Sequence, residues 1–581
     1  MFLASVLKSF AKRGRHDGAY GGAHSDAIRE AIALRDSGDV SRALDVLRGI
    51  LSQRPDHGEA HRAAGVCLAQ AAQYEEALPY LLRAATLMDR DPDVQLALGN
   101  VYGATGNREA AEGCYRSAIA LAPQAPAGYH NLGLLLRASG DPAGALPYLE
   151  RACDLLPFIE DAWRQRVLAL IALERYTDAI AVARVATDLE PGSAALWSSL
   201  GYACQSAHNP HAGLECYERA LALGAGDHEL WTRIAMVYQE QGRMEEAIIA
   251  YEKAIDLKPD DALARFHLAL ARLSMRQYEC GWDDYDLRLV SEDASIHVDR
   301  QRAWRDEPLA GHSIVVMGEQ GLGDEIMFAS CFREIIERAA RCVITCSPRL
   351  EGLFRRSFPA ATVLAVAPNV TATVADMDYQ VAAGTLPRYM RRSAAAFPEH
   401  RGYLRADPVR VAYWKDRVAA LGPGVKVGIS WRGGTHKSRS PLRTLPLSDW
   451  EPIFAAAGVH FVSVQYGNVR EDLDAAPADI AHWPDAIDDY DETAALLCAL
   501  DLVISVCTAV IHLAGALGRP VWIMSPVSPE WRYSIAGDKM DWYPSSRMFR
   551  QREFGNWAPV VADVAREVQA LAGHTHVLGE H

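Results

Sequence analysis

Two loops in the second half of the chain carry residues suited to holding an anion. The first reads Gly-Glu-Gln-Gly-Leu-Gly-Asp-Glu over residues 318–325, directly after an apolar run. Gly321 and Gly323 let the backbone approach a ligand, and a helix that begins here offers unpaired amide groups to an anion. Such turns also join strands to helices for steric reasons alone. The spacing differs from the dinucleotide fingerprint, and no matching acidic residue follows the next predicted strand.

The second loop begins the segment 505–520, which lies between two predicted strands. Thr508 is predicted at a helix start, where its hydroxyl and the free backbone amides can hold a phosphate. His512 follows four residues later on the same helical face. A satisfied core histidine is the alternative, but the spacing from Thr508 favours ligand contact. Cys507 is not predicted to be a nucleophile, because nothing beside it in sequence supplies a base, although His512 could do so in space.

Short β-branched runs alternate with helical segments from residue 309 onward and must position these loops. The alternation predicts parallel sheets, and the continuous apolar runs predict burial on both faces. We expect two doubly wound α/β domains, residues 309–420 and 421–581, with ligands bound in the cleft between them at the carboxyl ends of the strands. The predicted strands are Ser313–Met317, Arg341–Cys346, Val425–Ser430, 459–464, 502–505 and 521–524.

A period of thirty-four residues organises the first half of the chain, residues 25–278. Alanine recurs at this step, with Gly213 in one slot, and glycine and proline follow the same step. These series are Ala43, Ala77, Ala111, Ala145, Ala179 and Ala247; Ala84, Ala118, Ala152, Ala186, Ala220 and Ala254; Gly65, Gly99, Gly133 and Gly201; and Pro123, Pro157, Pro191 and Pro259. The pattern resembles the tetratricopeptide repeat, whose expected tryptophan appears as Trp163, Trp197 and Trp231.

Small residues at these positions let two antiparallel helices approach closely, and stacked helix pairs form a solenoid with a concave inner face. Polar residues precede the repeat's Leu-Gly position in the later repeats: Asn131, Gln165, Ser199, Arg233 and His267. We predict a polar groove there that hydrogen-bonds the backbone of an extended acceptor peptide. The alternative is a row of solvated residues on a curved surface. A capping helix is expected over residues 261–278, and residues 279–308 are expected to form a connector.

Composition limits the remaining possibilities. The 581 residues are too many for one core, and the net charge of −15 without a sustained basic run disfavours nucleic-acid binding. Eleven cysteines without a C-x-x-C pair indicate a reducing compartment and no structural zinc. No apolar stretch is long enough to span a bilayer. Residues 1–24 form an amino-terminal extension whose charges do not match a secretory signal, which leaves a weak amphipathic helix touching a membrane or partner as the alternative.

The second half resembles the nucleotide-sugar site of two-domain (GT-B) glycosyltransferases related to the bacterial heptosyltransferases. It is still more similar to proteins in which such a module follows a tetratricopeptide array, so the resemblance covers nearly the whole chain. The segments that carry it are residues 505–520, Val-Gly-Ile-Ser-Trp-Arg-Gly-Gly at 427–434, the basic loop 437–443, Arg-Thr-Leu-Pro-Leu at 443–447 and Pro-Glu-Trp-Arg-Tyr at 529–533.

The resemblance implies that Asp324 is the general base, which takes a proton from the acceptor hydroxyl. The alternative is that Asp324 caps the next helix. It also implies that cations of the basic loop stabilise the departing nucleoside phosphate without a metal, although an exposed basic loop is the alternative. The residues implied in donor binding are Gly321, Gly323, Arg432, Lys437, Arg439, Arg443, Gln465, Cys507, Thr508 and His512.

One departure from the family pattern concerns Cys507, which stands where the heptosyltransferases commonly have Asp. The missing carboxylate removes either an acceptor for a sugar hydroxyl or a source of repulsion toward an acidic sugar. The identity of the donor therefore stays open, with a nonulosonic acid among the candidates. An inactive enzyme fold retained as a scaffold is also compatible with this change.

These features lead to the hypothesis of a cytoplasmic, metal-independent, inverting glycosyltransferase that needs no cofactor beyond its nucleotide-sugar co-substrate. Its acceptor would be a Ser or Thr hydroxyl of a protein presented by the repeats. The similar proteins include enzymes that modify bacterial flagellins, so flagellin is the first acceptor to test. The alternatives are a non-catalytic adaptor with a degenerate enzyme fold, and a transferase that acts on a polysaccharide or lipid.

Overall fold

The computed structural model describes residues 25–290, 296–367, 374–433 and 440–578. The chain divides into two compact units, Met1–Gly226 and Asp227–His581. Residues 1–15, where the sequence leaves room for an amphipathic helix, lie outside the described ranges. Within those ranges, no helix is both long and apolar enough to cross a bilayer.

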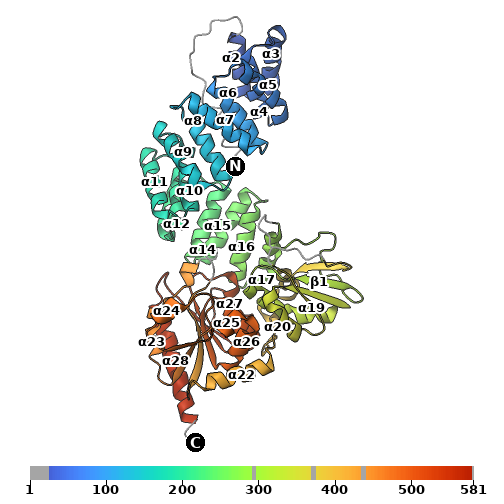
Figure 1. Ribbon diagram of the computed structural model, residues 1–581, viewed down its shortest axis with the longest axis vertical. Helices are drawn as coiled ribbons and strands as arrows, with labels where there is room; N and C mark the ends of the chain where they lie inside the picture. Colours follow the sequence, from blue (N-terminus) through green and yellow to red (C-terminus); the bar gives the residue numbers. More distant parts are fainter. Residues whose placement is uncertain (1–24, 291–295, 368–373, 434–439, 579–581) are drawn as a thin grey trace. The chain divides into compact units, whose positions relative to one another are not determined.

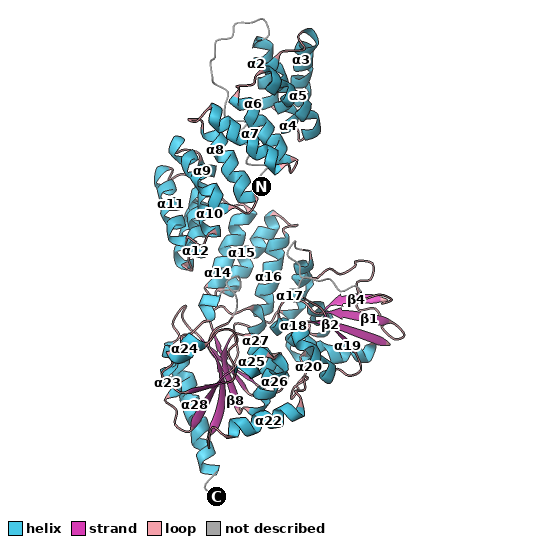
Figure 2. Ribbon diagram, viewed as in Figure 1, coloured by secondary structure: helices cyan, strands magenta, loops and turns pink. Residues whose placement is uncertain are grey.

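The first unit is a helical solenoid of antiparallel pairs, drawn in cyan in Figure 2. Its helices are α2 (Ser25–Asp36), α3 (Val40–Gln53), α4 (Gly58–Gln70), α5 (Tyr74–Leu87), α6 (Pro92–Ala104), α7 (Arg108–Leu121), α8 (Pro126–Ala138), α9 (Pro142–Leu155), α10 (Glu160–Ala172), α11 (Tyr176–Leu189), α12 (Ala194–Ser206) and α13 (Pro210–Ala222). The second unit begins with α14 (His228–Glu240), α15 (Met244–Leu257), α16 (Ala262–Ser274) and α17 (Tyr278–Tyr285).

The recurring small residues pack where the helices of one pair meet, as the period predicts. Ala43, Ala77 and Ala111 are completely buried. A Cβ atom added to Gly99 in α6 would lie 2.5 Å from the ring of Tyr115 in α7. That ring is itself buried, and its hydroxyl donates to Oδ1 of Asn100 over 2.9 Å. The glycine series is therefore set by close contact with the side chain sixteen residues later.

We expect Gly99→Ala to destabilise the protein by about 1–3 kcal/mol, because the added methyl group overpacks a rigid contact. Gly113→Ala is the matched control, since Gly113 is exposed in α7 and a Cβ there meets no atom within 4 Å. The control should gain up to about 1 kcal/mol from helix propensity. Thermal unfolding followed by circular dichroism distinguishes the two. Equal behaviour of both variants would contradict the packing argument.

Two parallel sheets lie in the rest of the second unit (Figures 1 and 2). The first has the order β3-β2-β1-β4 and the second the order β10-β9-β8-β5-β6-β7, and every named pair is parallel. The first sheet contains β1 (Ser313–Met317), β2 (Arg341–Cys346), β3 (Thr362–Ala365) and β4 (Tyr379–Ala382). The second contains β5 (Val425–Ser430), β6 (Val459–Ser463), β7 (Ile480–His482), β8 (Leu502–Val506), β9 (Val521–Ser525) and β10 (Ser546–Arg550).

Helices connect and cover these strands. They are α18 (Leu322–Phe328), α19 (Phe332–Arg338), α20 (Glu351–Ser357), α21 (Leu386–Met390), α22 (Pro408–Ala419), α23 (Glu451–Phe454), α24 (Arg470–Asp474), α25 (Pro484–Asp488), α26 (Tyr490–Ala499), α27 (Ala509–Ala516) and α28 (Ala558–Leu578). One apolar core joins the first sheet to one face of the second, and a smaller core lies under α28 on the other face. Parallel α/β architecture is thus confirmed, with the cores where the apolar strands predict them.

Two expectations from the sequence need correction. The predicted connector, 279–308, begins inside α17, because Tyr278, Trp282 and Tyr285 form an apolar helical face that is buried in the core. Four strands were also not predicted, namely β3, β4, β7 and β10. All four occupy sheet edges. Edge strands are short or partly polar, so the continuous apolar run that marks a central strand is missing.

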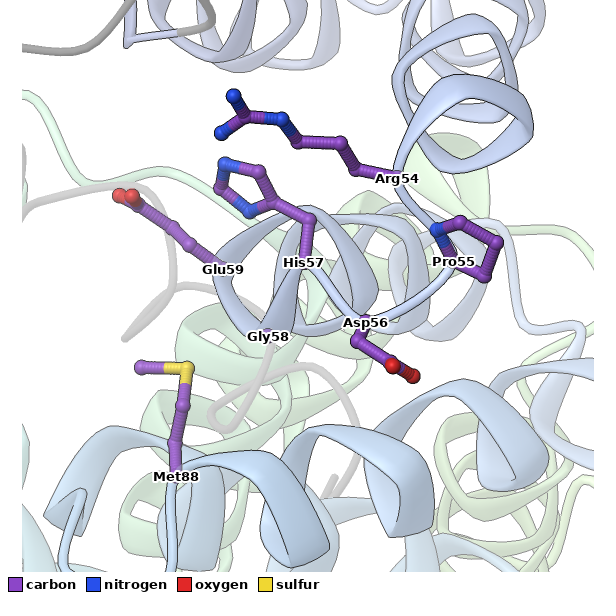
Figure 3. A pocket seen from close by; sticks show the side chains of 7 residues that line it. All are labelled: Arg54, Pro55, Asp56, His57, Gly58, Glu59 and Met88. Carbon is purple, nitrogen blue, oxygen red and sulfur yellow. The ribbon is translucent and has the colours of Figure 1, made fainter.

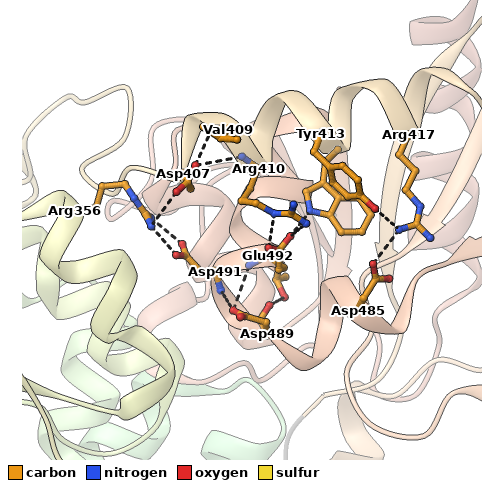
Figure 4. A network of polar contacts seen from close by, with 12 residues as sticks. Arg356, Asp407, Val409, Arg410, Tyr413, Arg417, Asp485, Asp489, Asp491 and Glu492 are labelled. Atoms are coloured by element: carbon orange, nitrogen blue, oxygen red, sulfur yellow. Dashed lines mark hydrogen bonds and ion pairs between the residues drawn. The ribbon is translucent and has the colours of Figure 1, made fainter.

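Ion pairs join α20 of the first sheet region to α26 of the second (Figure 4). Arg356 forms a bidentate contact with Asp491, with distances of 2.8 and 2.7 Å. Beside it, Arg410 of α22 pairs with Glu492, which also accepts from the indole of Trp414 over 2.7 Å. Planar guanidinium–carboxylate pairing of this kind favours one geometry, so the pair between Arg356 and Asp491 favours one arrangement of α20 against α26.

Candidate functional site

The two loops predicted to hold an anion meet in the second unit. Helix α18, which follows β1, packs against α27, which follows β8. A Cβ atom on Gly323 would lie 2.9 Å from Cδ2 of His512 and 3.5 Å from Cα of Ala509. Only glycine permits so close an approach. Residues from the carboxyl ends of strands in both sheets are therefore brought together.

Asp324 forms a nearly buried ion pair with Arg532 at this junction. Oδ1 of Asp324 lies 2.5 Å from Nη2 of Arg532, and the two side chains are 13% and 16% exposed. Oδ2 also accepts from the amide of Gly321 over 3.4 Å, so Asp324 caps α18 as well. Burial raises the pKa of Asp324 and the charge of Arg532 opposes that rise. The carboxylate thus caps α18, which the sequence offered as the alternative to a general base, and it also forms a charged contact; its role as a base stays a prediction.

His512 is enclosed by two tyrosines. Its Nδ1 lies 3.0 Å from the hydroxyl of Tyr543 and its Nε2 lies 3.1 Å from the hydroxyl of Tyr533. The side chain is 2% exposed. Burial and, second, the charge of Arg532 lower the pKa of His512 well below its ordinary value, so the ring is neutral. In this geometry both ring nitrogens already have partners within the protein.

A neutral buried histidine makes stability depend on pH. Below about pH 6.5 His512 is protonated in the unfolded chain but stays neutral in the folded chain. The free energy of unfolding therefore falls by up to about 1.4 kcal/mol for each unit by which the pH is lowered. We expect His512→Gln to flatten the fall between pH 7 and pH 5, although it lowers stability at pH 7. Urea unfolding at several pH values measures this. An unchanged slope in the variant would show that His512 titrates normally.

Thr508 begins α27, as the sequence predicts. Its Oγ1 accepts from the amide of Val510 over 3.3 Å and lies 3.0 Å from the hydroxyl of Ser505. Cys507 is buried, and burial raises the pKa of its thiol. A thiol with a raised pKa is a poor nucleophile, in line with the expectation from the sequence. The structure therefore gives Thr508 a capping role and Cys507 a packing role.

Arg443 and Glu530 form a second ion pair next to these residues. Nη1 of Arg443 also lies 3.4 Å from the carbonyl oxygen of Cys507. Because Arg443 follows β5 and Glu530 follows β9, the pair links two loops at the carboxyl edge of the second sheet. Lys437 and Arg439 lie outside the described residues.

Gln465 organises the loop that follows β5. Its Oε1 accepts from the hydroxyl of Ser430 and from the amides of Trp431 and Arg432, each over 3.0 Å. The side chain of Arg432 pairs with Asp472 over 3.1 Å and contacts the carbonyl of Asn468. Gln465 and Arg432, both predicted to bind the donor, therefore have contacts within the second α/β domain. These contacts shape the loop after β5.

Several charged residues at this junction were not predicted. Arg288, just after α17, pairs with Glu319 over 2.6 and 3.0 Å, and Glu319 also accepts from the amide of Gly384 over 2.9 Å. Arg532 and Glu530 follow β9, so their position at the carboxyl end of a parallel strand is a signal that could have identified them. Arg288 offers no such signal, because it lies in the segment expected to be a connector.

The residues predicted to form an acceptor groove differ in their surroundings. Asn131 and Gln165 are buried: Nδ2 of Asn131 donates to Asn100 over 2.9 Å, and Oε1 of Gln165 accepts from Arg137 over 2.7 Å. Ser199 donates to the carbonyl of Ala195. Arg233 and His267 belong to the second unit, where His267 stacks on Tyr251 at 6.0 Å. A continuous polar groove therefore stays a prediction.

A pocket of about 520 Å³ lies in the first unit at the turn between α3 and α4 (Figure 3). Its lining comprises Arg54, Pro55, Asp56, His57, Gly58, Glu59 and Met88. None of the predicted groove residues is among them. The lining contains the thioether of Met88 and side chains of both charges. This combination does not favour one class of ligand.

Comparison with known families identifies the repeats. Residues 28–94 and 96–158 match one tetratricopeptide-repeat model, and residues 228–261 match another. The amino-terminal region thus contains tetratricopeptide repeats, in agreement with the helix pairs and their buried alanines. The sheets that follow are those of an α/β protein.

The chain is similar to Protein FlbA of Caulobacter vibrioides, with 28% identity across 98% of this chain and 100% of that protein. It is also 24% identical to superkiller complex protein 3 of Mus musculus, over 43% of this chain but only 19% of that protein. Among solved structures, a tetratricopeptide-repeat protein from Parabacteroides merdae is 14% identical, with a TM-score of 0.36, and covers 43% of this chain and 99% of its own length. The similarity to FlbA extends through both sheets.

Proposed function

We propose that this chain is a GT-B-type glycosyltransferase that moves a sugar from a nucleotide-sugar donor to Ser or Thr hydroxyls of a protein. In this proposal the tetratricopeptide repeats recruit the acceptor, and flagellin is the first candidate. The reaction takes place in the cytoplasm and needs no metal. The proposal extends the resemblance of the loops at 318–325, 427–434, 505–520 and 529–533 to that family.

The contact between α18 and α27 is the observation that carries the proposal. Asp324 and His512 were selected from separate loops of the sequence, and Gly323 packs directly on His512. A two-domain transferase requires such a junction, because the acceptor is activated by one domain while the donor is held by the other. The partly buried pairs Asp324–Arg532 and Arg443–Glu530 supply charge at the same edge of the second sheet.

The chemistry assigned to Asp324 is proton removal. As the acceptor oxygen bonds to the anomeric carbon, its proton passes to the Asp324 carboxylate and the bond from that carbon to the donor phosphate breaks. The nucleoside phosphate leaves with the bonding electron pair, and cations near it stabilise its charge. Arg532 favours the ionised form of Asp324, which is the form that accepts a proton.

Intact-mass spectrometry of flagellin co-expressed with and without this chain tests the proposal. We expect an added mass of one or more sugars only when the chain is present. Calorimetry of the purified chain with UDP-, CMP-, GDP- and ADP-sugars identifies the donor. Unmodified flagellin beside a newly modified polysaccharide or lipid would change the acceptor but retain the enzyme.

A second candidate is a non-catalytic adaptor that retains the enzyme fold. The enclosure of His512 between two tyrosines favours it, since both ring nitrogens are engaged and the side chain is 2% exposed. An adaptor is expected to bind none of the four nucleotide sugars. Binding of any one of them with micromolar affinity would exclude the adaptor.

A further inference from the structure

A pocket of about 230 Å³ lies at the carboxyl ends of β9 and β10. Its lining includes neither Asp324, Thr508 nor His512. The volume equals that of about eight water molecules in the liquid, and it is below the range of about 300–1,000 Å³ typical of complete small-molecule sites. The pocket therefore accommodates one side chain or ring. Its apolar walls come from three loops and consist of Leu442, Leu445, Pro446, Pro526, Val527, Phe554 and Trp557.

Gln551 lines this pocket and carries a buried hydrogen-bond donor. Its backbone amide donates to Ser525 over 2.8 Å, and its side-chain Oε1 accepts from the amide of Val527 over 3.2 Å. The Val527 amide can only donate, so the oxygen must face it and Nε2 faces the other way. Nε2 has no partner among the described residues, although Gln551 is only 6% exposed. A ligand oxygen at this point satisfies the donor.

The charge of the lining distinguishes a nucleotide sugar from a peptide as the ligand. Among the described residues that line the pocket, Asp449 is charged and none is Lys, Arg or His. Such a lining does not compensate the phosphates of a nucleotide sugar. An extended peptide instead offers an apolar side chain and, next to it, a backbone carbonyl that accepts a hydrogen bond. The lining thus matches a peptide better than a nucleotide.

The pocket lies between the last repeats and the candidate site. On one side, the hydroxyl of Ser528 donates to the carbonyl of Gln239 over 2.6 Å, and a Cβ on Gly242 would lie 2.9 Å from Val527. The turn between α14 and α15 therefore borders the pocket. On the other side, the lining residues Thr444 and Ser528 stand one and two positions from the Arg443–Glu530 pair.

We propose that this pocket holds one aromatic or branched apolar side chain of the acceptor polypeptide. Nε2 of Gln551 donates a hydrogen bond to a carbonyl oxygen of the same segment. The inference rests on the proposed function for the nature of the acceptor, and it adds a sequence preference near the modified hydroxyl. Since an extended residue spans about 3.3–3.6 Å, the apolar residue and the hydroxyl are expected a few positions apart.

The test uses the full chain and fluorescein-labelled twelve-residue peptides, comprising a set tiled across flagellin and a randomised set. Fluorescence anisotropy measures the affinity of each peptide, and calorimetry measures that of the nucleotide sugars. We expect the indole of Leu442→Trp to fill the pocket. The affinity for peptides that contain an apolar residue should then fall by at least about 10-fold. Gln551→Glu keeps an oxygen that accepts from the amide of Val527 but removes the side-chain donor. It should lower the affinity for the same peptides by about 5- to 10-fold. Donor affinity should be unchanged.

Val409→Trp is the matched control, because Val409 is 74% exposed on α22 and does not line the pocket. It should leave peptide affinity unchanged. The proposal is wrong if no peptide of either set binds the wild-type chain, if both pocket variants bind peptides as the control does, or if they lose donor affinity instead. Peptide binding without sugar transfer would contradict the proposed function. It would still support the assignment of this pocket as a peptide-binding site.

Discussion

Asp324→Asn is expected to lower the rate of sugar transfer to flagellin by about 10²–10⁴-fold, the usual contribution of a general base. Asparagine retains an oxygen that can accept from the amide of Gly321, but it cannot take a proton. The cap of α18 should therefore persist while the chemical step is lost. Initial rates from intact-mass spectrometry, at saturating donor, measure the effect.

The control for this variant is Asp407→Asn, which changes a second aspartate that caps a helix. Asp407 accepts from the amide of Val409 over 2.8 Å at the start of α22 and lies outside the candidate site. Its variant should transfer sugar at the wild-type rate. If Asp324→Asn remains active and His512→Ala does not, Asp324 is not the base and the residues around α27 are the essential ones.

The pH profile gives a second readout of the same assignment. A base acts only when ionised, so the rate should fall as pH drops through the pKa of Asp324, which burial raises above that of an ordinary aspartate. Arg532 opposes that rise. Arg532→Gln is therefore expected to move the acidic fall in rate toward higher pH. An unmoved profile would separate Arg532 from the proton transfer.

The largest effect on stability is expected from Arg288→Met, at about 3–5 kcal/mol. Arg288 and Glu319 are both buried, with side chains 8% and 2% exposed, and methionine removes the cation that balances the Glu319 carboxylate. Loss of one partner leaves a charge in a medium that solvates it poorly. Thermal unfolding of the full chain should show a midpoint lower by about 4–7 °C for the transition of the second unit.

The control is Arg547→Met, which breaks an exposed pair in the same unit. Arg547 and Glu567 are 45% and 33% exposed, and such pairs contribute at most about 1 kcal/mol. Arg288→Met combined with Glu319→Leu should recover part of the loss, because no charge is then left buried. If Arg288→Met is no more harmful than the control, the buried pair does not stabilise this junction.

Much of the fold could be predicted because its signals are local. Glycine recurs at positions 65, 99, 133 and 201, and each of these glycines packs against the leucine or tyrosine sixteen residues later, so four helix pairs repeat the same close contact. The six predicted strands begin where expected and end within one residue of their predicted ends, because central parallel strands are apolar throughout. Helix α17 was missed because the second alanine series stops at Ala254, with Arg288 at the next position, although Gly281 of α17 still stands thirty-four residues after Ala247.

The candidate site was predictable only in part. The loops containing Asp324, Thr508 and His512 were recognised by glycine, hydroxyl and helix-start patterns that lie within a few residues of each other. Arg532 and Tyr533 follow β9, where their position could have marked them, and Tyr543 comes from a further segment, but no local pattern shows which residues the three contact. The same is true of Gln551, whose unpaired donor exists only because its oxygen is held by Val527.

The amino-acid sequence by itself determined the repeats, the parallel α/β architecture and the helix start at Thr508. These follow from periodicity, apolar runs and capping, which act between residues near in the chain. Only the tertiary structure decided that Asp324 pairs with Arg532, that His512 is closed in by two hydroxyls and that a pocket opens beside the last repeats. Those features depend on burial and on the meeting of distant segments, and both arise only when the chain is folded.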